Sequence, residues 1–259
     1  MFFNCIKEFM KNNLRFSTLA LALVTFTGTA AAGTVKISGA STVFNVVVSP
    51  AKANVEKSTG HTLQIIGSGT GKGLIDLVDG VSDIAMVSEP MDIAVEAAAV
   101  AGKKIDAKSI QFFEVKKDEI VFVVHPSNAV GKLTWEQLRD IHTGKIANWK
   151  DVGGKDKPIV VYSDSTTGGT RAMVKKVVMG GAEYGPTVKA QTSVKRAAEM
   201  VGSDEAGITG VGKGFVDAAK NKIVDTKKIE RPLALATLGV PKPAAKAVID
   251  AFTKEASSL

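Results

Sequence analysis

The sequence predicts an α/β protein whose sheets are mostly parallel. Short apolar, β-branched runs alternate with stretches of helical periodicity along most of the chain, as expected for strands connected by helices. Residues 33–259 are sufficient for one large domain or for two lobes of roughly 100 residues each. Segments that could cross between two lobes lie around Phe113–Glu119 and Ile229–Ala234, where charge interrupts a strand pattern.

Each strand is predicted from a short apolar run, and each helix from apolar residues at helical spacing. The run Glu119–Val124 (EIVFVV) is typical of a buried strand. The predicted strands are Thr34–Ser38, Thr62–Ile66, Asp83–Val87, Ile110–Glu114, Glu119–Val124, Pro158–Tyr162, Ala206–Thr209 and Leu233–Thr237. The predicted helices are Val43–Ser58, Gly71–Val78, Val95–Ala101, Thr134–Ile141, Thr170–Met179, Ser193–Val201 and Pro243–Ala256.

Two of these helices carry specific signals. Thr134 can cap its helix, and Gln137 stands three residues later, as in a capping box. The closing helix is amphipathic, with one apolar stripe formed by Ala247, Val248, Ala251 and Phe252.

The first 32 residues predict a secretory signal peptide. A basic start is followed by the nearly uncharged run Ser17–Ala30 and by small residues at Ala30–Ala32, so cleavage is expected before Gly33. Either Met1 or Met10 could be the true start, because the signal is complete from Met10. We therefore expect an exported, periplasmic protein. No cysteine stands at the cleavage point, so a lipid anchor is not indicated.

Composition excludes several kinds of site. The single cysteine, Cys5, lies inside the predicted signal, so the mature chain has neither disulfides nor thiolate chemistry. The formal net charge is +7, but lysines are scattered and no basic cluster is interleaved with aromatic residues. Nucleic-acid binding is therefore not expected. The three histidines, His61, His125 and His142, lack metal-ligand spacing, so no metal and no cofactor are predicted.

Three loops share one design, in which a strand leads through Gly, Ser and Thr residues into a helix. They are Ser38–Thr42 (SGAST), Gly67–Gly73 (GSGTGKG) and Thr166–Arg171 (TTGGTR). The first turn of a helix has backbone N–H groups without intrahelical partners, and hydroxyls add further donors, so such ends bind small oxyanions. A single such loop is usually only a helix cap. Three of them at the carboxyl ends of strands predict a shared ligand crevice.

Enzymatic signatures are weak. The Gly67–Gly73 segment fits neither the Walker spacing nor the dinucleotide-binding motif, because Lys72 and Gly73 occupy the wrong positions. No G-x-S-x-G elbow is present. An exported phosphatase remains an alternative class, but it would need a nucleophile with a base, or a metal cluster. The sequence predicts a binding protein and not an enzyme.

These loops, in this order, resemble the PstS-like phosphate-binding proteins of bacterial ABC importers. The strongest stretches are Gly67–Met91 and Leu133–Arg171, and the resemblance extends from Lys36 to about Phe252. It implies a type II periplasmic-binding fold of two α/β lobes that close on an anion. The expected lobes are 33–115 with 230–259, and 116–229. The implied partners are inorganic phosphate or a similar anion and an inner-membrane ABC permease, with the binding protein a monomer.

The resemblance also implies site residues. Thr42 and the Val43 backbone would contact the anion from the first loop, Ser68 from the second, and Gly169 and Thr170 from the third. Glu89 aligns with an acidic residue that accepts a proton of phosphate. The candidate ligand-binding residues are Ser41, Thr42, Val43, Ser68, Gly69, Glu89, Asp164, Gly168, Gly169, Thr170 and Arg171.

Two positions depart from the family pattern. Gly168 replaces a common serine, and Asp164 replaces a common arginine. Two carboxylates beside an anion would each cost about 3 kcal/mol at roughly 5–6 Å and an effective dielectric of about 20. Arg171 or Lys72 could compensate. One hypothesis is that the ligand or its affinity has changed, which includes a non-phosphate ligand or a sensing role. The other is that Asp164 caps a turn and faces water.

Overall fold

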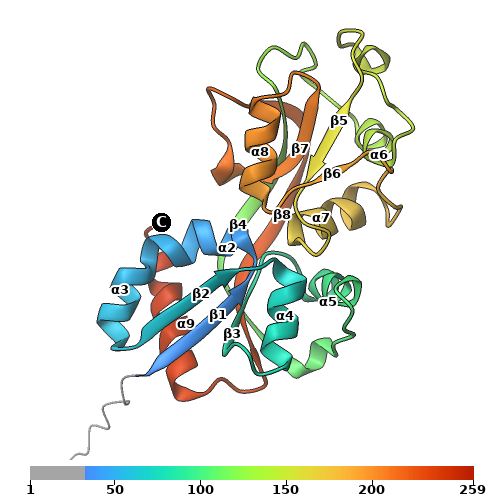
Figure 1. Ribbon diagram of the computed structural model, residues 1–259. Helices are drawn as coiled ribbons and strands as arrows, with labels where there is room; N and C mark the ends of the chain where they lie inside the picture. Colours follow the sequence, from blue (N-terminus) through green and yellow to red (C-terminus); the bar gives the residue numbers. More distant parts are fainter. Residues whose placement is uncertain (1–32) are drawn as a thin grey trace, which may run out of the picture. The chain divides into compact units, whose positions relative to one another are not determined.

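Eight strands lie in one continuous order, β2-β1-β3-β8-β4-β7-β5-β6, with helices packed on the sheet (Figure 1). The computed structural model describes residues 33–259, so the predicted signal peptide lies outside the described residues. The outer pairs, β1–β2, β1–β3, β5–β7 and β5–β6, are parallel. The three central pairs, β3–β8, β4–β8 and β4–β7, are antiparallel. The predicted α/β class is confirmed, with two halves joined by two long antiparallel strands.

The first half of the chain builds the end of the sheet that contains β1, β2 and β3. Its long first helix runs through a π-helical turn without a break, so the predicted helix Val43–Ser58 is extended at both ends. Its elements are β1 (Thr34–Gly39), α2 (Ser41–Val43), η1 (Phe44–Val48), α3 (Ser49–Thr59), β2 (Thr62–Gly67), α4 (Thr70–Val78), β3 (Ile84–Val87), α5 (Met91–Val100) and η2 (Ala107–Ser109).

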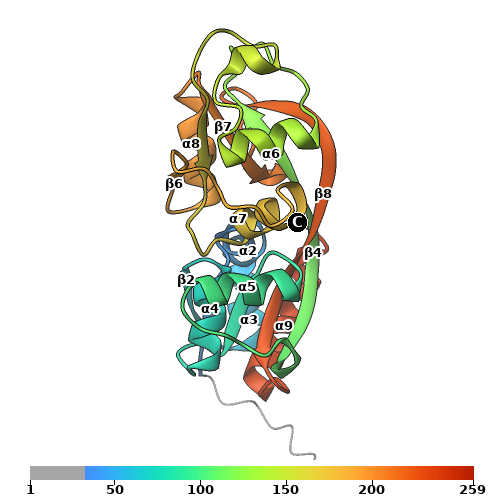
Figure 2. The same ribbon diagram turned by 90° about the vertical axis from the view of Figure 1, so that its right-hand side faces the viewer.

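Two long strands, β4 (Ile110–Val124) and β8 (Lys222–Leu238), pair with each other through both halves (Figure 2). The prediction of separate strands at Ile110–Glu114 and Glu119–Val124 was wrong, and β8 begins eleven residues before the predicted Leu233. Charged residues interrupt the apolar pattern where the strands cross. Backbone pairing does not depend on that pattern, and it continues past an irregularity between Glu114 and Lys116.

The second half contributes β5, β6 and β7 and the helices around them. The predicted capping box at Thr134 and Gln137 is confirmed, with both reciprocal hydrogen bonds formed. The two-residue strand β6 and the short 3₁₀ turns have no apolar run long enough to predict them. The elements are α6 (Trp135–Thr143), η3 (Trp149–Val152), β5 (Val160–Ser163), α7 (Gly169–Met173), η4 (Val174–Val178), β6 (Lys189–Ala190), α8 (Val194–Gly202), β7 (Gly207–Gly212), η5 (Lys213–Phe215) and α9 (Pro243–Ala256), the last returning to the first half.

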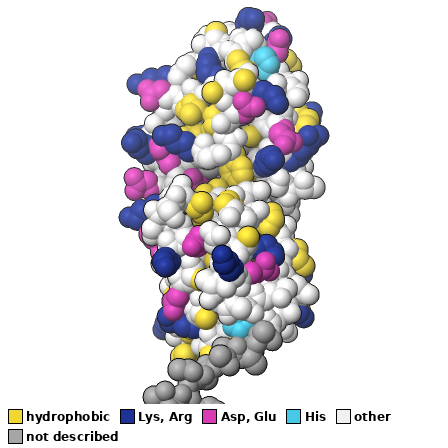
Figure 3. Space-filling view, turned by 90° about the vertical axis from the view of Figure 1, so that its left-hand side faces the viewer, with side chains coloured by type: hydrophobic (Ala, Val, Ile, Leu, Met, Phe, Trp, Pro, Cys, Tyr) yellow, Lys and Arg dark blue, Asp and Glu magenta, His cyan; other side chains and the backbone are white. Residues whose placement is uncertain are grey.

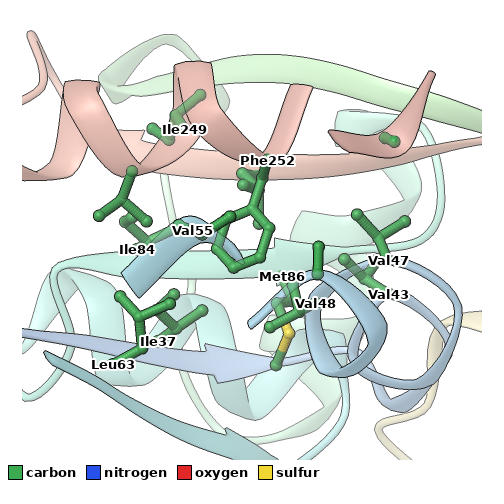
Figure 4. Packing of buried hydrophobic residues seen from close by; sticks show 14 of the residues in the cluster. Ile37, Val43, Val47, Val48, Val55, Leu63, Ile84, Met86, Ile249 and Phe252 are labelled. Atoms are coloured by element: carbon green, nitrogen blue, oxygen red, sulfur yellow. The ribbon is translucent and has the colours of Figure 1, made fainter. Parts of the chain in front are cut away.

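The buried apolar residues form clusters that lie almost entirely in one half or the other, with Ile93 of α5 joining a cluster of the second half. In the first half, Ile249 and Phe252 of α9 belong to one cluster with Ile37 of β1 and Met86 of β3 (Figure 4). In the second half, Trp149 is among the largest fully buried side chains. The predicted apolar stripe of α9 is buried at Val248 and Phe252, whereas Ala247 and Ala251 are only half-buried.

Surface charge is mixed. On the face drawn in Figure 3, basic and acidic side chains are interspersed. Ion pairs such as Lys150–Asp156 and Lys157–Glu205 occur at the surface. Within residues 33–259, every helix is too short or too polar to cross a lipid bilayer.

Candidate ligand-binding site

A small cavity of about 10 Å³ lies where the three predicted loops converge. It is far smaller than the sites that bury drug-sized ligands. Its walls are mostly hydroxyl groups, glycines and backbone. The lining residues are Ala40, Ser41, Thr42, Gly69, Ser88, Asp164, Ser165, Gly168, Gly169, Thr170, Thr192, Ser193 and Val194. The structure therefore brings together seven of the predicted site residues.

The first loop leaves β1 and starts the helix that begins at Ser41. Ser41 and Thr42 line the cavity, whereas Val43 is fully buried behind them. The Thr42 side chain is also buried and accepts a hydrogen bond from Arg231 of β8, a strand that both halves share. This loop therefore supplies hydroxyl groups at the wall of the cavity.

The glycine-rich second loop contributes less backbone than expected. Gly69 lines the cavity with φ at 88°, a left-handed conformation that favours glycine. The N–H groups of Ser68 and Gly69 both donate to the Gly39 carbonyl, at 2.8 and 2.9 Å. The Ser68 hydroxyl is buried without a hydrogen-bond partner. The hydroxyl, and not the amides, is thus the free polar group of this loop.

The third loop places two glycines directly against two carboxyl groups. A Cβ at Gly168 would lie 2.0 Å from Asp164 Oδ2, and a Cβ at Gly169 would lie 1.9 Å from Glu89 Oε2. Real Cβ atoms do not approach other atoms so closely. The absence of side chains at these positions therefore makes room for the two carboxyl groups.

Glu89 is completely buried beneath this loop. Its Oε2 accepts hydrogen bonds from Ser88 N at 3.1 Å, from Ser88 Oγ at 2.8 Å and from Thr70 Oγ1 at 3.1 Å. Its Oε1 has no partner. Burial raises the pKa of Glu89, and the hydrogen bonds from Ser88 and Thr70 oppose that shift.

Asp164 lines the cavity and is only 6% exposed, so it does not face water. Its Oδ1 is buried without a hydrogen-bond partner. Burial raises the pKa of Asp164 to about 7; Arg231 lowers it, and the neighbouring charge of Glu89 raises it. Asp164 therefore forms part of the cavity wall, and it does not cap a turn at the protein surface.

Arg231 is a residue of the candidate site that the sequence analysis does not predict. It lies on β8, is 2% exposed, and forms an ion pair with Asp118 of β4, with Nη2 and Oδ2 2.7 Å apart. Its Nη1 donates to Thr170 Oγ1 at 2.7 Å and its Nη2 to Thr42 Oγ1 at 3.4 Å. The sequence shows that Arg231 lies in a predicted crossing segment. It does not show that Arg231 contacts Thr170 and Thr42, which are 61 and 189 residues away along the chain.

This arrangement orients two hydroxyl groups. A threonine oxygen that accepts a hydrogen bond from a guanidinium keeps its own proton free to donate elsewhere. Thr42 and Thr170 both line the cavity, so their protons can be donated to a ligand there. Arg231 thus supports two donors from opposite sides of the cavity.

The two cations proposed to compensate for Asp164 point elsewhere. Lys72 pairs with Asp76 at 2.8 Å. Arg171 donates to Ser163 Oγ at 2.6 Å and stacks over the Tyr184 ring, 3.9 Å from its centroid. The structure does not bring Arg171 into the cavity wall, although the residue is adjacent to it in sequence.

A larger groove lies between α5 and α7, with Glu96, Arg171, Lys176 and Tyr184 among its lining residues. Lys176 and Glu96 form an exposed ion pair across it, at 2.8 Å. Its polar groups already have partners, unlike those of the small cavity. Among residues 33–259, five buried side-chain polar atoms lack a partner, and three of them belong to Ser68, Glu89 and Asp164. Asp164 lines the small cavity, and Ser68 and Glu89 are the sequence neighbours of its lining residues Gly69 and Ser88, which favours this cavity as the site.

The placement of the described side chains does not support a metal site. Within the described part of the chain, no three His, Cys, Asp or Glu residues are placed to hold a metal ion. The site is built from hydroxyls, two carboxyl groups and one guanidinium.

Comparison with known proteins agrees with this geometry. The phosphate-binding protein PstS of Bacillus subtilis is 31% identical over 168 residues, which cover 64% of this chain and 53% of that protein. PstS of Staphylococcus saprophyticus is 30% identical over 200 residues, which cover 75% of this chain and 60% of that protein. The chain thus spans little more than half the length of these relatives.

A solved structure agrees in both fold and sequence. A putative phosphate ABC transporter substrate-binding protein from Clostridium perfringens, with bound phosphate, superposes with a TM-score of 0.73 at 26% identity. The alignment covers 84% of this chain and 92% of that one. A family model described as a PBP superfamily domain matches residues 24–257. The chain therefore belongs to the PBP superfamily, and it is PstS-like within it.

Proposed function

We propose that this protein captures phosphate, or a closely related small oxyanion, in the cavity between its two halves and delivers it to an ABC importer. The observation that carries the proposal is the pair of hydroxyls, Thr42 and Thr170, which Arg231 holds on opposite sides of one cavity. Neutral donors supported by one buried cation favour a small anion. The PstS relatives, and the related structure with bound phosphate, support phosphate as the first candidate.

The proposed ligand contacts come from four parts of the chain. Ser41 and Thr42, Ser68, and Gly169 with Thr170 supply the donors, because they line the cavity or carry an unpartnered buried oxygen. Gly69 forms part of the wall, and the Asp164 carboxyl group faces the ligand. The Glu89 carboxyl group lies directly behind Gly169 of the wall and would contact the ligand through its free oxygen. The predicted contacts of Val43 and Arg171 are not part of this proposal, because their side chains lie outside the cavity wall.

We propose the lobes 33–115 with 230–259, and 116–229, on the basis of the separate apolar clusters. We further propose that residues 1–32 direct export to the periplasm and are removed there, and that the mature protein acts as a monomer without a cofactor. The permease is the partner expected of a transport role. A binding role is favoured over catalysis by the relatives, which are phosphate-binding proteins by name.

The two buried carboxyl groups support a second candidate, a binding protein with the same fold but a different ligand or a sensing role. Carboxylates would accept hydrogen bonds from a neutral or cationic solute. Arg231 and the hydroxyl donors favour the anion, so phosphate is the ligand to test first.

The test is a titration of the purified protein with phosphate at pH 7, followed by melting temperature and by the fluorescence of Trp135 and Trp149. Saturation at 100 times the dissociation constant should stabilise the fold by about 2.7 kcal/mol, which raises the melting temperature by about 5–10 °C. We expect this at micromolar phosphate but not with sulfate, which offers no proton to the carboxylates. No response at millimolar phosphate would contradict the proposal.

A matched pair of variants locates the binding site. Thr170→Val should weaken phosphate binding by roughly 10–100-fold, because a hydrogen bond to a charged group contributes about 1.5–3 kcal/mol. Thr62→Val makes the same change at an exposed position of β2 and should leave the affinity unchanged. Equal effects of the two substitutions would argue against this cavity.

A further inference from the structure

Two carboxyl groups at the candidate site each keep one buried oxygen without a hydrogen-bond partner. We propose that Asp164 is protonated when the ligand is bound, so that the protein takes up a proton from solvent together with its anion, while Glu89 stays an acceptor for a proton of the ligand. The inference rests on the proposed function and adds that binding of the anion is coupled to uptake of a proton. Asp164 then acts as a hydrogen-bond donor at the position where relatives commonly have an arginine.

The contacts of Glu89 leave one oxygen free to accept a hydrogen bond from the ligand. Oε2 is occupied by three donors from Ser88 and Thr70. Oε1 is buried and unpartnered. An ionised carboxyl group only accepts hydrogen bonds, so Oε1 can accept one from a protonated oxygen of phosphate while the bonds at Oε2 stay intact.

The two oxygens of Asp164 have different surroundings. Its Oδ2 lies against Gly168. Its Oδ1 is buried and unpartnered, on a residue that lines the cavity. A proton on Oδ1 would provide a donor in the cavity wall, and an ionised Asp164 would instead present a bare negative oxygen to an anion.

The charged groups around the two carboxyl groups do not compensate for a third negative charge. Arg231 is the nearest cation, but Asp118 already pairs with it. Arg171 lies on the far side of Asp164, against Ser163 and the Tyr184 ring. Each uncompensated repulsion, at about 5 Å and an effective dielectric of about 20, corresponds to roughly a hundredfold in affinity.

The other titratable groups that face Asp164 are neutral. His142, Tyr162 and Tyr184 line a narrow space on the side of Asp164 away from the ligand. Burial lowers the pKa of His142 to about 4, so His142 carries no charge near neutral pH. Burial raises the pKa of both tyrosines. Near neutral pH, only Glu89, Asp118, Asp164, Arg171 and Arg231 can determine the charge of this region.

The direction of the pH dependence follows from linkage. Burial raises the pKa of Asp164 to about 7 in the free protein, and the negative charge of Glu89 also raises it. A bound anion favours the neutral form of Asp164 still further. Binding and protonation therefore strengthen each other, and affinity falls as pH rises above about 7, by about tenfold per pH unit for each proton taken up.

The experiment counts protons. Phosphate is titrated into the protein by calorimetry at pH 5.5 and pH 8, in buffers of different ionisation enthalpy, and the number of protons taken up on binding is obtained from the buffer dependence. Asp164→Asn is compared with the wild type, since the amide keeps the shape and a donor but cannot titrate. The difference between the two proteins removes the contribution of phosphate itself. Asp250→Asn, at an exposed ion pair on α9, is the matched control.

At pH 8 we expect the wild type to take up close to one proton more than Asp164→Asn, and at pH 5.5 nearly the same number. Asp164→Asn should bind phosphate more tightly than the wild type at pH 8, and Asp250→Asn should match the wild type at both pH values. Equal proton uptake by wild type and Asp164→Asn at pH 8, with phosphate still bound, would overturn the inference and leave the proposed function standing. No phosphate binding by any of the proteins would overturn both.

Discussion

At the scale of single residues, Asp164 and Gly168 form one unit. The two departures from the family pattern, which are four residues apart in sequence, have a common explanation in space. The Asp164 carboxyl group occupies the volume that a side chain at 168 would need, with a clearance of only 2.0 Å for a Cβ. In the conformation that Asp164 adopts here, only glycine fits at 168.

This dependence can be measured. Gly168→Ser should destabilise the protein by about 1–3 kcal/mol, because a buried site without space must distort to accept added atoms. Gly168→Ser combined with Asp164→Ala should recover most of that loss. Urea unfolding of the two single variants and the double variant gives the coupling free energy, which we expect to be about 1–3 kcal/mol.

Gly131→Ser is the control, since a Cβ there meets no atom within 4 Å and the backbone is not left-handed. A coupling near zero would show that the Asp164 side chain can move aside.

The sequence allowed Asp164 to be identified but not Arg231, and the reason is physical. Asp164 lies within a loop whose glycines and hydroxyls already mark it as a ligand loop. Arg231 belongs to a strand, and its partners Thr42, Asp118 and Thr170 come from three other segments. Local pattern carries no information about contacts across such separations, which only the folded chain establishes.

At the scale of secondary structure, the glycine-rich segment Gly67–Gly73 serves packing as much as binding. A Cβ at Gly71 would lie 2.4 Å from the Ala97 carbonyl oxygen of α5, and a Cβ at Gly73 would lie 2.4 Å from Gly39 Cα of β1. Only Gly69 of these three lines the cavity. The glycines let α4 approach its neighbours closely, and this approach brings the loop to the cavity.

Gly73→Ala is therefore expected to lower the free energy of unfolding by at least about 1–3 kcal/mol, despite the better helix propensity of alanine. The obstructing atoms are backbone, so a change of rotamer cannot relieve the contact. Gly131→Ala, at the open position used above, should stay within about 0.5 kcal/mol of the wild type. Urea denaturation monitored by tryptophan fluorescence makes the comparison; similar values for both variants would contradict the packing role.

The elements themselves were predicted unevenly. Helix α6 was predicted well because its capping box is a local signal that the backbone uses directly. Strands β4 and β8 were predicted only in part, because Lys116–Glu119 and Lys227–Glu230 break the apolar pattern without breaking the hydrogen-bonded ladder. Charged side chains can extend from a continuous strand, so hydrophobic periodicity underestimates strands that join two halves of a protein.

At the scale of the whole described chain, the buried pair Arg231–Asp118 lies on the two strands shared by both halves. Arg231 pairs with Asp118 across the β4–β8 ladder and also reaches a hydroxyl from each half. The same side chain thus connects stability and binding. To separate the effect of Arg231 on stability from its effect on binding, a variant must restore the stability but not the binding.

Arg231→Met should cost about 3–5 kcal/mol of stability, because it leaves the Asp118 carboxylate buried without its counter-charge. Adding Asp118→Asn should restore much of the stability but not the phosphate affinity, since the support of Thr42 and Thr170 stays lost. Chemical denaturation and phosphate titration of the single and double variants distinguish the two effects. Wild-type affinity in the double variant would show that Arg231 has no part in binding.

The location of this ion pair affects how the binding protein can open. The guanidinium is anchored to the paired backbone of β4 and β8, whereas the hydroxyls that it contacts belong to loops at the ends of other strands. If the halves swing apart, the positive charge remains with the shared ribbon while the loops retreat from it. An incoming anion would then encounter the cation first, and the hydroxyls would assemble around it afterwards.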